Sequence, residues 1–182
     1  MSKKICIYCG ANTGNNPVII QEITKLIGLL IQQDFDLVYG GGKTGLMGII
    51  ADQFLAANRQ VIGVRPTKLI ADEAAHEGLT ELIVVKDMSE RKRKMIELSD
   101  AFIALPGGVG TLDEIMDVYT QVKIGFLDQF CGILNVADYY EGLEILLKNM
   151  VDKGFLRATD KQLLHIESSA QELLERLVKV IG

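Results

Sequence analysis

Residues 100–123 of the chain read DAFIALPGGVGTLDEIMDVYTQVK. The apolar run at 101–105 predicts a buried strand, a glycine-rich turn follows it, and beyond Thr111 apolar residues recur at helical spacing. A strand, a tight turn and a helix in direct succession form the unit from which parallel α/β sheets are built. The stretch therefore predicts an α/β fold. It also places a glycine-rich turn at the carboxyl end of a strand, where such folds bind ligands.

The same alternation of apolar runs and amphipathic stretches extends along the chain. We expect strands at residues 4–10, 36–40, 60–64, 81–85, 100–105, 130–135 and 162–167. We expect helices at residues 17–33, 45–58, 89–98, 111–123 and 139–150, and a terminal helix that ends near Val180. Short strands rich in Val, Ile and Leu are typical of a sheet that is buried on both faces. The prediction is a single domain, residues 1–182, with a Rossmann-like, doubly wound, mostly parallel sheet of about seven strands and helices on both faces.

The composition of the chain limits the classes of partner that the protein is expected to bind. The 182 residues are 48% hydrophobic and carry a net charge of −5. A negative net charge argues against broad binding to nucleic acids or anionic membranes, so neither is expected as a partner. No apolar run approaches the roughly 18 residues that span a bilayer, and the start of the chain lacks the apolar core of a signal peptide. We therefore expect a cytoplasmic protein.

Cys6 and Cys9 form a C-x-x-C pair, which invites a redox interpretation. Both lie in or at the end of the first predicted strand, where odd spacing points side chains to opposite faces. A redox pair normally opens a helix, whose dipole lowers the thiol pKa. We therefore expect a role in the core or beside the site. The three Cys and two His of the chain show no metal-ligand spacing, so no metal site is expected.

A first glycine motif, YGGGKTGLMG, occupies residues 39–48. Its spacing resembles a dinucleotide fingerprint, but it follows the second predicted strand instead of the first. A Walker loop is excluded because Leu37 stands where that motif needs glycine. Two interpretations stay open. The turn, with Gly41 and Gly42, could hold an anion at a helix N-terminus, or it could serve only tight packing of strand against helix.

The second glycine motif, PGGVGT at residues 106–111, is followed by two acids. Thr111 and Glu114 have the spacing of a capping box, and Asp113 suits the positive end of a helix dipole. The alternative is that a carboxylate acts on whatever the loop holds. Asp113 and Thr120 share a polar arc of the predicted helix, with Glu114 at its edge. That arc could be solvated or could line a cleft.

A basic run, SERKRKM at residues 89–95, is usually a solvated helix face. Here Met88, Arg91 and Met95 fall on one side of the predicted helix. An inward-facing Arg91 needs a partner, because an unpaired buried charge is costly, and a phosphate or a carboxylate would serve. The alternative is an arginine at the helix start whose charged end reaches solvent.

Several motifs together carry a family resemblance. CIYCGANTG, LVYGGGKTGLMG, DMSERK, LPGGVGTLDE and GILNVADYYEGL occur in that order between residues 3 and 157. The chain resembles the Lonely Guy family of cytokinin-activating phosphoribohydrolases, whose bacterial members are often labelled lysine decarboxylases. The resemblance implies a Rossmann-like fold and hydrolysis of the N-glycosidic bond of AMP or N6-substituted AMP, which releases the free base and ribose 5-phosphate. It also implies that no cofactor or metal is needed, and that the protein forms a homodimer with its site near the subunit contact.

Carried over by motif, Glu114 is the expected catalytic carboxylate and Arg91 its cationic partner. The remaining residues expected to bind substrate are Gly41, Gly42, Glu73, Met88, Lys92, Gly107, Gly108, Val109, Gly110, Thr111, Asp113 and Thr120. The chain departs from the family pattern at several positions, among them Arg65, where an aliphatic residue is common, Ser89 and Val109. These departures bear on base preference.

Two other classes of protein compete with this expectation. A non-catalytic nucleotide-binding or cofactor-carrier protein of the same fold is the alternative, and Arg91 and Glu114 at the family spacing speak against it. A lysine decarboxylase normally needs pyridoxal phosphate bound to a lysine as a Schiff base. The sequence contains no convincing site for that cofactor.

Overall fold

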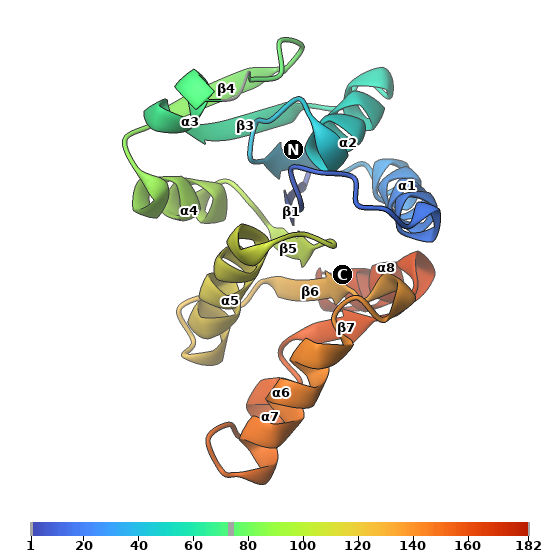
Figure 1. The fold of residues 1–182 in the computed structure, drawn as a ribbon, viewed down its shortest axis with the longest axis vertical. Helices are drawn as coiled ribbons and strands as arrows, with labels where there is room; N and C mark the ends of the chain where they lie inside the picture. The colour runs from blue at the N-terminus through green and yellow to red at the C-terminus, as the bar shows by residue number, and fades with distance from the viewer. Residues whose placement is uncertain (1, 73–74, 182) are drawn as a thin grey trace.

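The computed structural model describes residues 2–72 and 75–181 of the chain. In this described part, seven strands form one sheet in the order β4-β3-β2-β1-β5-β6-β7, and every neighbouring pair is parallel (Figure 1). The strands are β1 Lys4–Tyr8, β2 Asp36–Tyr39, β3 Val61–Pro66, β4 Glu81–Val85, β5 Ala101–Ala104, β6 Phe130–Leu134 and β7 His165–Glu167. The predicted doubly wound α/β fold is confirmed, and the sheet is parallel throughout.

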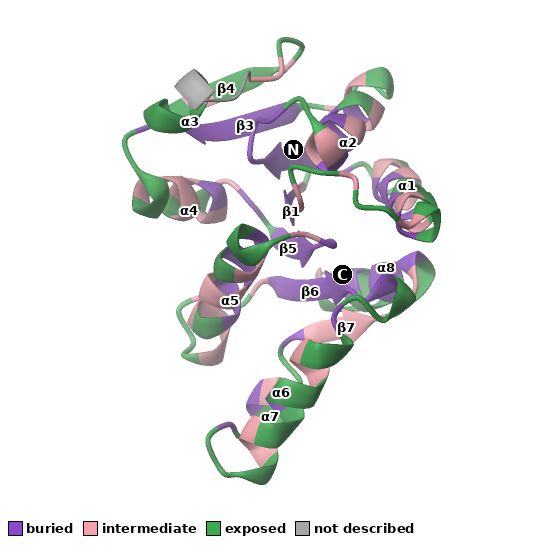
Figure 2. Ribbon diagram, viewed as in Figure 1, coloured by how far each residue is buried: buried purple, intermediate pink, exposed green. Residues whose placement is uncertain are grey.

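Helices cover both faces of the sheet (Figure 1). Helices α1, α2 and α8 pack on one face, whereas α4, α5 and α6 pack on the other. The central strands are buried along their length, and β4 at the edge is largely exposed (Figure 2). None of the described helices combines the length and apolar character needed to cross a bilayer. The helices are α1 Pro17–Gln32, α2 Gly45–Ala56, α3 Thr67–Asp72, α4 Met88–Glu97, α5 Val109–Lys123, the 3₁₀ turn η1 Val136–Asp138, α6 Glu141–Asp152, α7 Ala158–Lys161 and α8 Ala170–Ile181.

The strand order reverses direction between β1 and β5. The chain runs outward from β1 to β4 and then returns to place β5 on the other side of β1. Consequently the helix after β1 and the helix after β5 lie on opposite faces of the sheet. Such a switch point leaves a crevice beyond the carboxyl ends of the strands, and ligands of this fold class bind there.

Helix α5 begins earlier than the capping box predicted. Its N-cap is Gly108 and its first residue is Val109, so Thr111 is the third helical residue instead of the cap. The capping-box prediction was therefore wrong. The physical reason is that Thr111 is buried with its side chain packed over Gly107, while the glycine loop itself forms the first turn.

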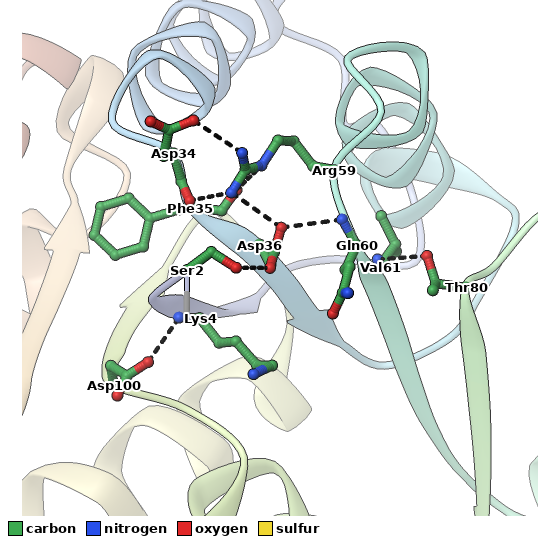
Figure 3. A network of polar contacts seen from close by, with 10 residues as sticks. All are labelled: Ser2, Lys4, Asp34, Phe35, Asp36, Arg59, Gln60, Val61, Thr80 and Asp100. Atoms are coloured by element: carbon green, nitrogen blue, oxygen red, sulfur yellow. Dashed lines mark hydrogen bonds and ion pairs between the residues drawn. The ribbon is translucent and has the colours of Figure 1, made fainter.

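A polar network lies at the amino ends of β1, β2 and β3, which is the end of the sheet opposite the crevice (Figure 3). Asp36 is only 3% exposed, and its carboxylate accepts hydrogen bonds from Gln60 N at 3.0 Å and from the Ser2 hydroxyl. Arg59 lies 3.1 Å from the same carboxylate, pairs with the exposed Asp34 at 2.9 Å and also donates to a main-chain carbonyl. The network therefore satisfies a buried charge far from the carboxyl ends.

Candidate active site

A cleft of about 730 Å³ opens at the switch point. Its walls come from the loop after β1 (residues 9–16), Gly40 after β2, Arg65 on β3 and the glycine loop 106–111 after β5. Helix α4 contributes Arg91 and helix α5 contributes Glu114. The cleft is thus built from the carboxyl ends of four adjacent strands, as expected for a doubly wound sheet.

Arg91 and Glu114 meet in this cleft. Arg91 Nη1 lies 3.0 Å from Glu114 Oε1, and the side chains are only 12% and 8% exposed. The contact is an ion pair without hydrogen-bond geometry, and Oε1 accepts no hydrogen bond from the described residues. Arg91 Nε donates to Val64 O at 3.1 Å, which fixes the guanidinium beside the end of β3. The partner that the inward-facing arginine required is therefore a carboxylate.

The pKa of Glu114 reflects two opposing influences. Burial raises the pKa of this carboxyl above its ordinary range, and the nearby Arg91 guanidinium lowers it in part. A titratable group that is shifted by burial, paired with one specific cation and set in a cleft is typical of functional sites. The arrangement can hold a carboxylate beside a reacting carbon, where it stabilises positive charge or takes a proton from water.

The glycine loop forms the neighbouring wall. A Cβ on Gly107 would collide with Thr111 Oγ1 and come within 2.9 Å of Gly10 N, so only glycine fits there. Gly108, the N-cap of α5, offers no side chain, and the first N–H groups of a helix have no partner within the helix. Together with the helix dipole, these N–H groups favour an anion. Val109 is 86% exposed at the rim.

The first glycine motif serves mainly packing. Gly41 O accepts a hydrogen bond from His76 N at 3.1 Å, and Gly42 O accepts one from the Tyr39 hydroxyl at 3.1 Å. A Cβ on Gly45 would collide with the Ala11 carbonyl. Gly40 reaches the cleft, whereas Gly41 and Gly42 do not line it. The packing interpretation therefore accounts for most of this motif.

Other predicted substrate-binding residues lie beside the cleft. Lys92 pairs with Asp113 at 3.1 Å and with Asp117 at 3.4 Å, in a groove between α4 and α5. Thr120 is exposed and donates to Met116 O within its own helix. The polar arc of α5 therefore faces α4 and solvent, and these side chains do not line the cleft.

Of the predicted residues Met88 and Glu73, only Met88 lies within the described part of the chain. Met88 is 41% exposed, and its Sδ lies 3.8 Å from Arg91 Nη1, so it touches Arg91 without lining the cleft. Glu73 lies outside the described residues. Within the described residues, no group of three or more His, Cys, Asp or Glu side chains is arranged to hold a metal ion.

The C-x-x-C pair is split across the sheet. Cys6 packs in the core layer beneath α4 and α5, and Cys9 packs against the layer beneath α1 and α2. Burial raises the pKa of the Cys6 thiol to about 12, and it raises that of Cys9 well above its ordinary range. Both thiols stay protonated near neutral pH, which is the opposite of what a redox pair requires. Cys9 lines the cleft, so a near-site role fits it.

Two stretches of the cleft wall were not predicted. Residues 12–16 line it beside the start of α1, where Asn16 caps the helix by accepting from Val18 N at 3.0 Å. Tyr139 also lines it, and its hydroxyl donates to Gly107 O at 2.6 Å. The available signals were the Asn- and Gly-rich turn after the first strand and the tyrosine pair in NVADYYEGL.

Comparisons with known proteins identify relatives of the chain as a whole. The family described as "Possible lysine decarboxylase" matches residues 47–177. Two relatives in Arabidopsis thaliana, the cytokinin riboside 5′-monophosphate phosphoribohydrolases LOG1 and LOG7, are 41% and 38% identical. Each alignment covers 96% of this chain, and it covers 82% of LOG1 and 81% of LOG7.

Solved structures share the fold at low sequence identity. A molybdenum cofactor binding protein from Rippkaea orientalis is 19% identical with a TM-score of 0.74, covering 100% of this chain and 99% of that one. The molybdenum cofactor carrier protein of Chlamydomonas reinhardtii is 16% identical with a TM-score of 0.71, again covering 100% and 99%. These likenesses show the fold alone. The family model and the two relatives, each aligned over 96% of this chain, show more than the fold. The chain belongs to the Lonely Guy family of lysine-decarboxylase-like proteins.

Proposed function

We propose that this protein is a nucleoside 5′-monophosphate phosphoribohydrolase, which hydrolyses the N-glycosidic bond of AMP or N6-substituted AMP. The observation that carries the proposal is the buried Arg91–Glu114 pair, at 3.0 Å, one helical turn from a glycine loop suited to a phosphate. Relatives 41% and 38% identical carry the name cytokinin riboside 5′-monophosphate phosphoribohydrolase.

The order of groups along the cleft suggests how the substrate lies. The phosphate takes the N–H groups at Gly107–Thr111, and the ribose follows beside Glu114. The base then points toward Arg65 and Leu69, at the end of β3. Strand β3 is three strand spacings from β5, roughly 14 Å at about 4.8 Å per spacing, which gives an extended nucleotide room to lie across the strand ends.

The proposed reaction adds water across the bond between the anomeric carbon and the base. That bond breaks with its electron pair going to the base nitrogen, and the sugar gains oxocarbenium character. The Glu114 carboxylate stabilises this cation or removes a proton from the attacking water, while the base takes up a proton. Arg91 favours the ionised form of Glu114 by its proximity. The products are the free base and ribose 5-phosphate, and no cofactor takes part.

Incubation of the purified protein with AMP and with N6-isopentenyl-AMP tests the proposal. Release of ribose 5-phosphate and free base is the expected result. Failure of the wild type on a panel of nucleotides would reject it. Tight binding of AMP without cleavage would instead favour the non-catalytic carrier of the same fold.

We further propose a homodimer in the cytoplasm. The end of α5 presents exposed apolar side chains, with Ile124 55% and Phe126 79% exposed, and these are candidates for a subunit contact. The three cysteines are free, which fits a reducing compartment. Light scattering during size-exclusion chromatography tests the dimer, and a molar mass of 20.0 kDa would contradict it. No nucleic acid or membrane partner is proposed.

A further inference from the structure

A short segment after β6, residues 135–140, contacts the glycine loop through two tyrosines. The Tyr139 hydroxyl donates to Gly107 O at 2.6 Å, and the Tyr140 hydroxyl donates to Leu105 O at 2.8 Å. Neither bond belongs to the regular sheet or to a helix. The segment therefore fixes main-chain carbonyls in the loop that leads into α5.

The loop carbonyl between these two is also fixed. Pro106 O accepts a hydrogen bond from Gly10 N at 3.1 Å, across the switch point. The three consecutive carbonyls of residues 105–107 are thus each held by a different partner. These three hydrogen bonds give a defined orientation to the peptide planes that follow residues 105, 106 and 107.

The segment that carries the tyrosines is itself rigidly held. Tyr140 is 3% exposed, and its N–H donates to Asn135 Oδ1 at 2.6 Å. Asn135, which is also buried, donates from Nδ2 to Glu144 Oε2 at 2.8 Å, tying the segment to α6. The Tyr139 and Tyr140 rings meet edge to face with centroids 4.9 Å apart. Tyr139 is therefore held in place although it is 47% exposed.

The backbone before the tyrosines is strained. Ala137 and Asp138 both adopt left-handed conformations, with φ of 53° and 56°. Residues with side chains rarely do so, and two in succession persist only where the surroundings impose them. Such strain clusters at ligand sites. Here its effect is to turn the chain so that Tyr139 reaches the glycine loop.

The contact has a direct consequence for anion binding. The Gly107 carbonyl and the Gly108 N–H belong to one planar trans peptide and point in opposite directions. A hydroxyl that holds the carbonyl therefore also fixes the direction of the N–H, which is one of the unpaired donors at the start of α5. We propose that Tyr139 is a positioning residue for the substrate phosphate, because it holds the Gly107–Gly108 peptide with its N–H toward the anion. This inference rests on the proposed phosphate site.

Tyr139→Phe tests the inference, since it removes the hydroxyl and keeps the ring. Calorimetric titration with ribose 5-phosphate and with inorganic phosphate is expected to show roughly ten-fold weaker binding than in the wild type. With AMP as substrate, KM is expected to rise by a similar factor, while kcat stays within about two-fold. Thermal melting checks that the fold is retained.

Tyr119→Phe is the matched control. It also removes a tyrosine hydroxyl that donates to a main-chain carbonyl, Asp160 O at 3.1 Å, but this bond joins α5 to α7 and Tyr119 does not line the cleft. Its affinity for ribose 5-phosphate is expected to match the wild type. Unchanged phosphate affinity in Tyr139→Phe would overturn the inference and leave the proposed function standing. A wild type that binds neither ribose 5-phosphate nor inorganic phosphate would overturn both.

Discussion

Glu114 is the residue on which the proposed chemistry depends, and its surroundings act on its charge in opposite directions. Burial favours the neutral acid, whereas Arg91 at 3.0 Å favours the carboxylate. Burial is the larger influence, so the pKa of Glu114 is raised. The proposed reaction needs the ionised form. Because the pKa is raised, ionising Glu114 costs the fold some stability, a conflict that is common where activity and stability compete.

Glu114→Gln is expected to lower kcat by a factor of about 10²–10⁴, because the amide can neither accept a proton nor stabilise a cation as a carboxylate does. Ribose 5-phosphate release from AMP measures the effect. The affinity of the variant for ribose 5-phosphate should stay close to that of the wild type, since the phosphate contacts are intact. Full activity in this variant would remove Glu114 from the mechanism.

The pH dependence of stability offers a test without substrate. A carboxyl whose pKa is raised by folding stabilises the protein most below its unfolded pKa, about 4.3, and this contribution is lost as pH rises through the raised folded pKa. The melting temperature of the wild type relative to Glu114→Gln should therefore fall as pH increases from about 4 and level off above the folded pKa. The unpaired Arg91 in the variant adds an offset that does not change with pH. Parallel curves would contradict the raised pKa.

Arg65 is predicted to influence base preference. It is 2% exposed, lines the cleft and donates to Leu69 O at 2.9 Å, at the end where the base is proposed to lie. A guanidinium offers only donors and disfavours an apolar N6 substituent nearby. Arg65→Met should raise the ratio of kcat/KM for N6-isopentenyl-AMP over AMP by about ten-fold. An unchanged ratio in a folded variant would exclude this role.

At the scale of elements, the strands were predictable from their apolar runs, and the longer helices were predictable from their helical periodicity. The strand at 81–85 and the start of α1 at Pro17 match the prediction, the latter since proline suits the first helical turn. The short helices α3, η1 and α7 were missed, because three to six residues carry too little periodicity to read. The start of α5 was misplaced because burial of Thr111 over Gly107 is a tertiary contact.

The turn before α5 gives a prediction about stability. Gly107→Ala is expected to destabilise the fold by about 1–3 kcal/mol, because the new Cβ would press on Thr111 and on Gly10 N. Gly110→Ala is the control, since its Cβ would meet nothing within 4 Å and alanine favours a helix by up to about 1 kcal/mol. Urea denaturation measures both. Equal losses in the two variants would contradict the steric explanation.

At the scale of the whole molecule, the amino ends of the strands carry a network that the sequence did not reveal, because Asp36 and Arg59 meet only once β2 and β3 pair. Asp36→Ala is expected to lower the free energy of unfolding by about 2–3 kcal/mol with KM unchanged, since Arg59 loses its buried partner. Asp34→Asn is the matched control. It removes the exposed partner of the same arginine and keeps a residue that tolerates the left-handed backbone, so a loss below about 1 kcal/mol is expected. A comparable loss in both would show that exposure does not matter here.

The site was predictable from the sequence only where a local motif held the information. Arg91 and Glu114 were assigned from residue type and family spacing, and the structure brings them together. The loop at residues 12–16 and Tyr139 reach the cleft through the strand order at the switch point, which no local pattern encodes. Lys92 and Asp113 lie on the same two helices as Arg91 and Glu114. They face each other beside the cleft, because neighbouring positions on a helix point in different directions.

Because every strand runs the same way, the two ends of the sheet have different tolerance to mutation. The cleft end presents loops whose side chains can vary while the backbone scaffold persists, and the opposite end keeps Asp36 and Arg59 satisfied whatever occurs at the cleft. Substitutions in the cleft that change base preference can lower the free energy of unfolding. The contacts at the amino ends of the strands would then keep the protein folded. In a parallel sheet of this kind, substitutions at the carboxyl ends of the strands can change substrate specificity, while the contacts at the amino ends that stabilise the fold stay intact.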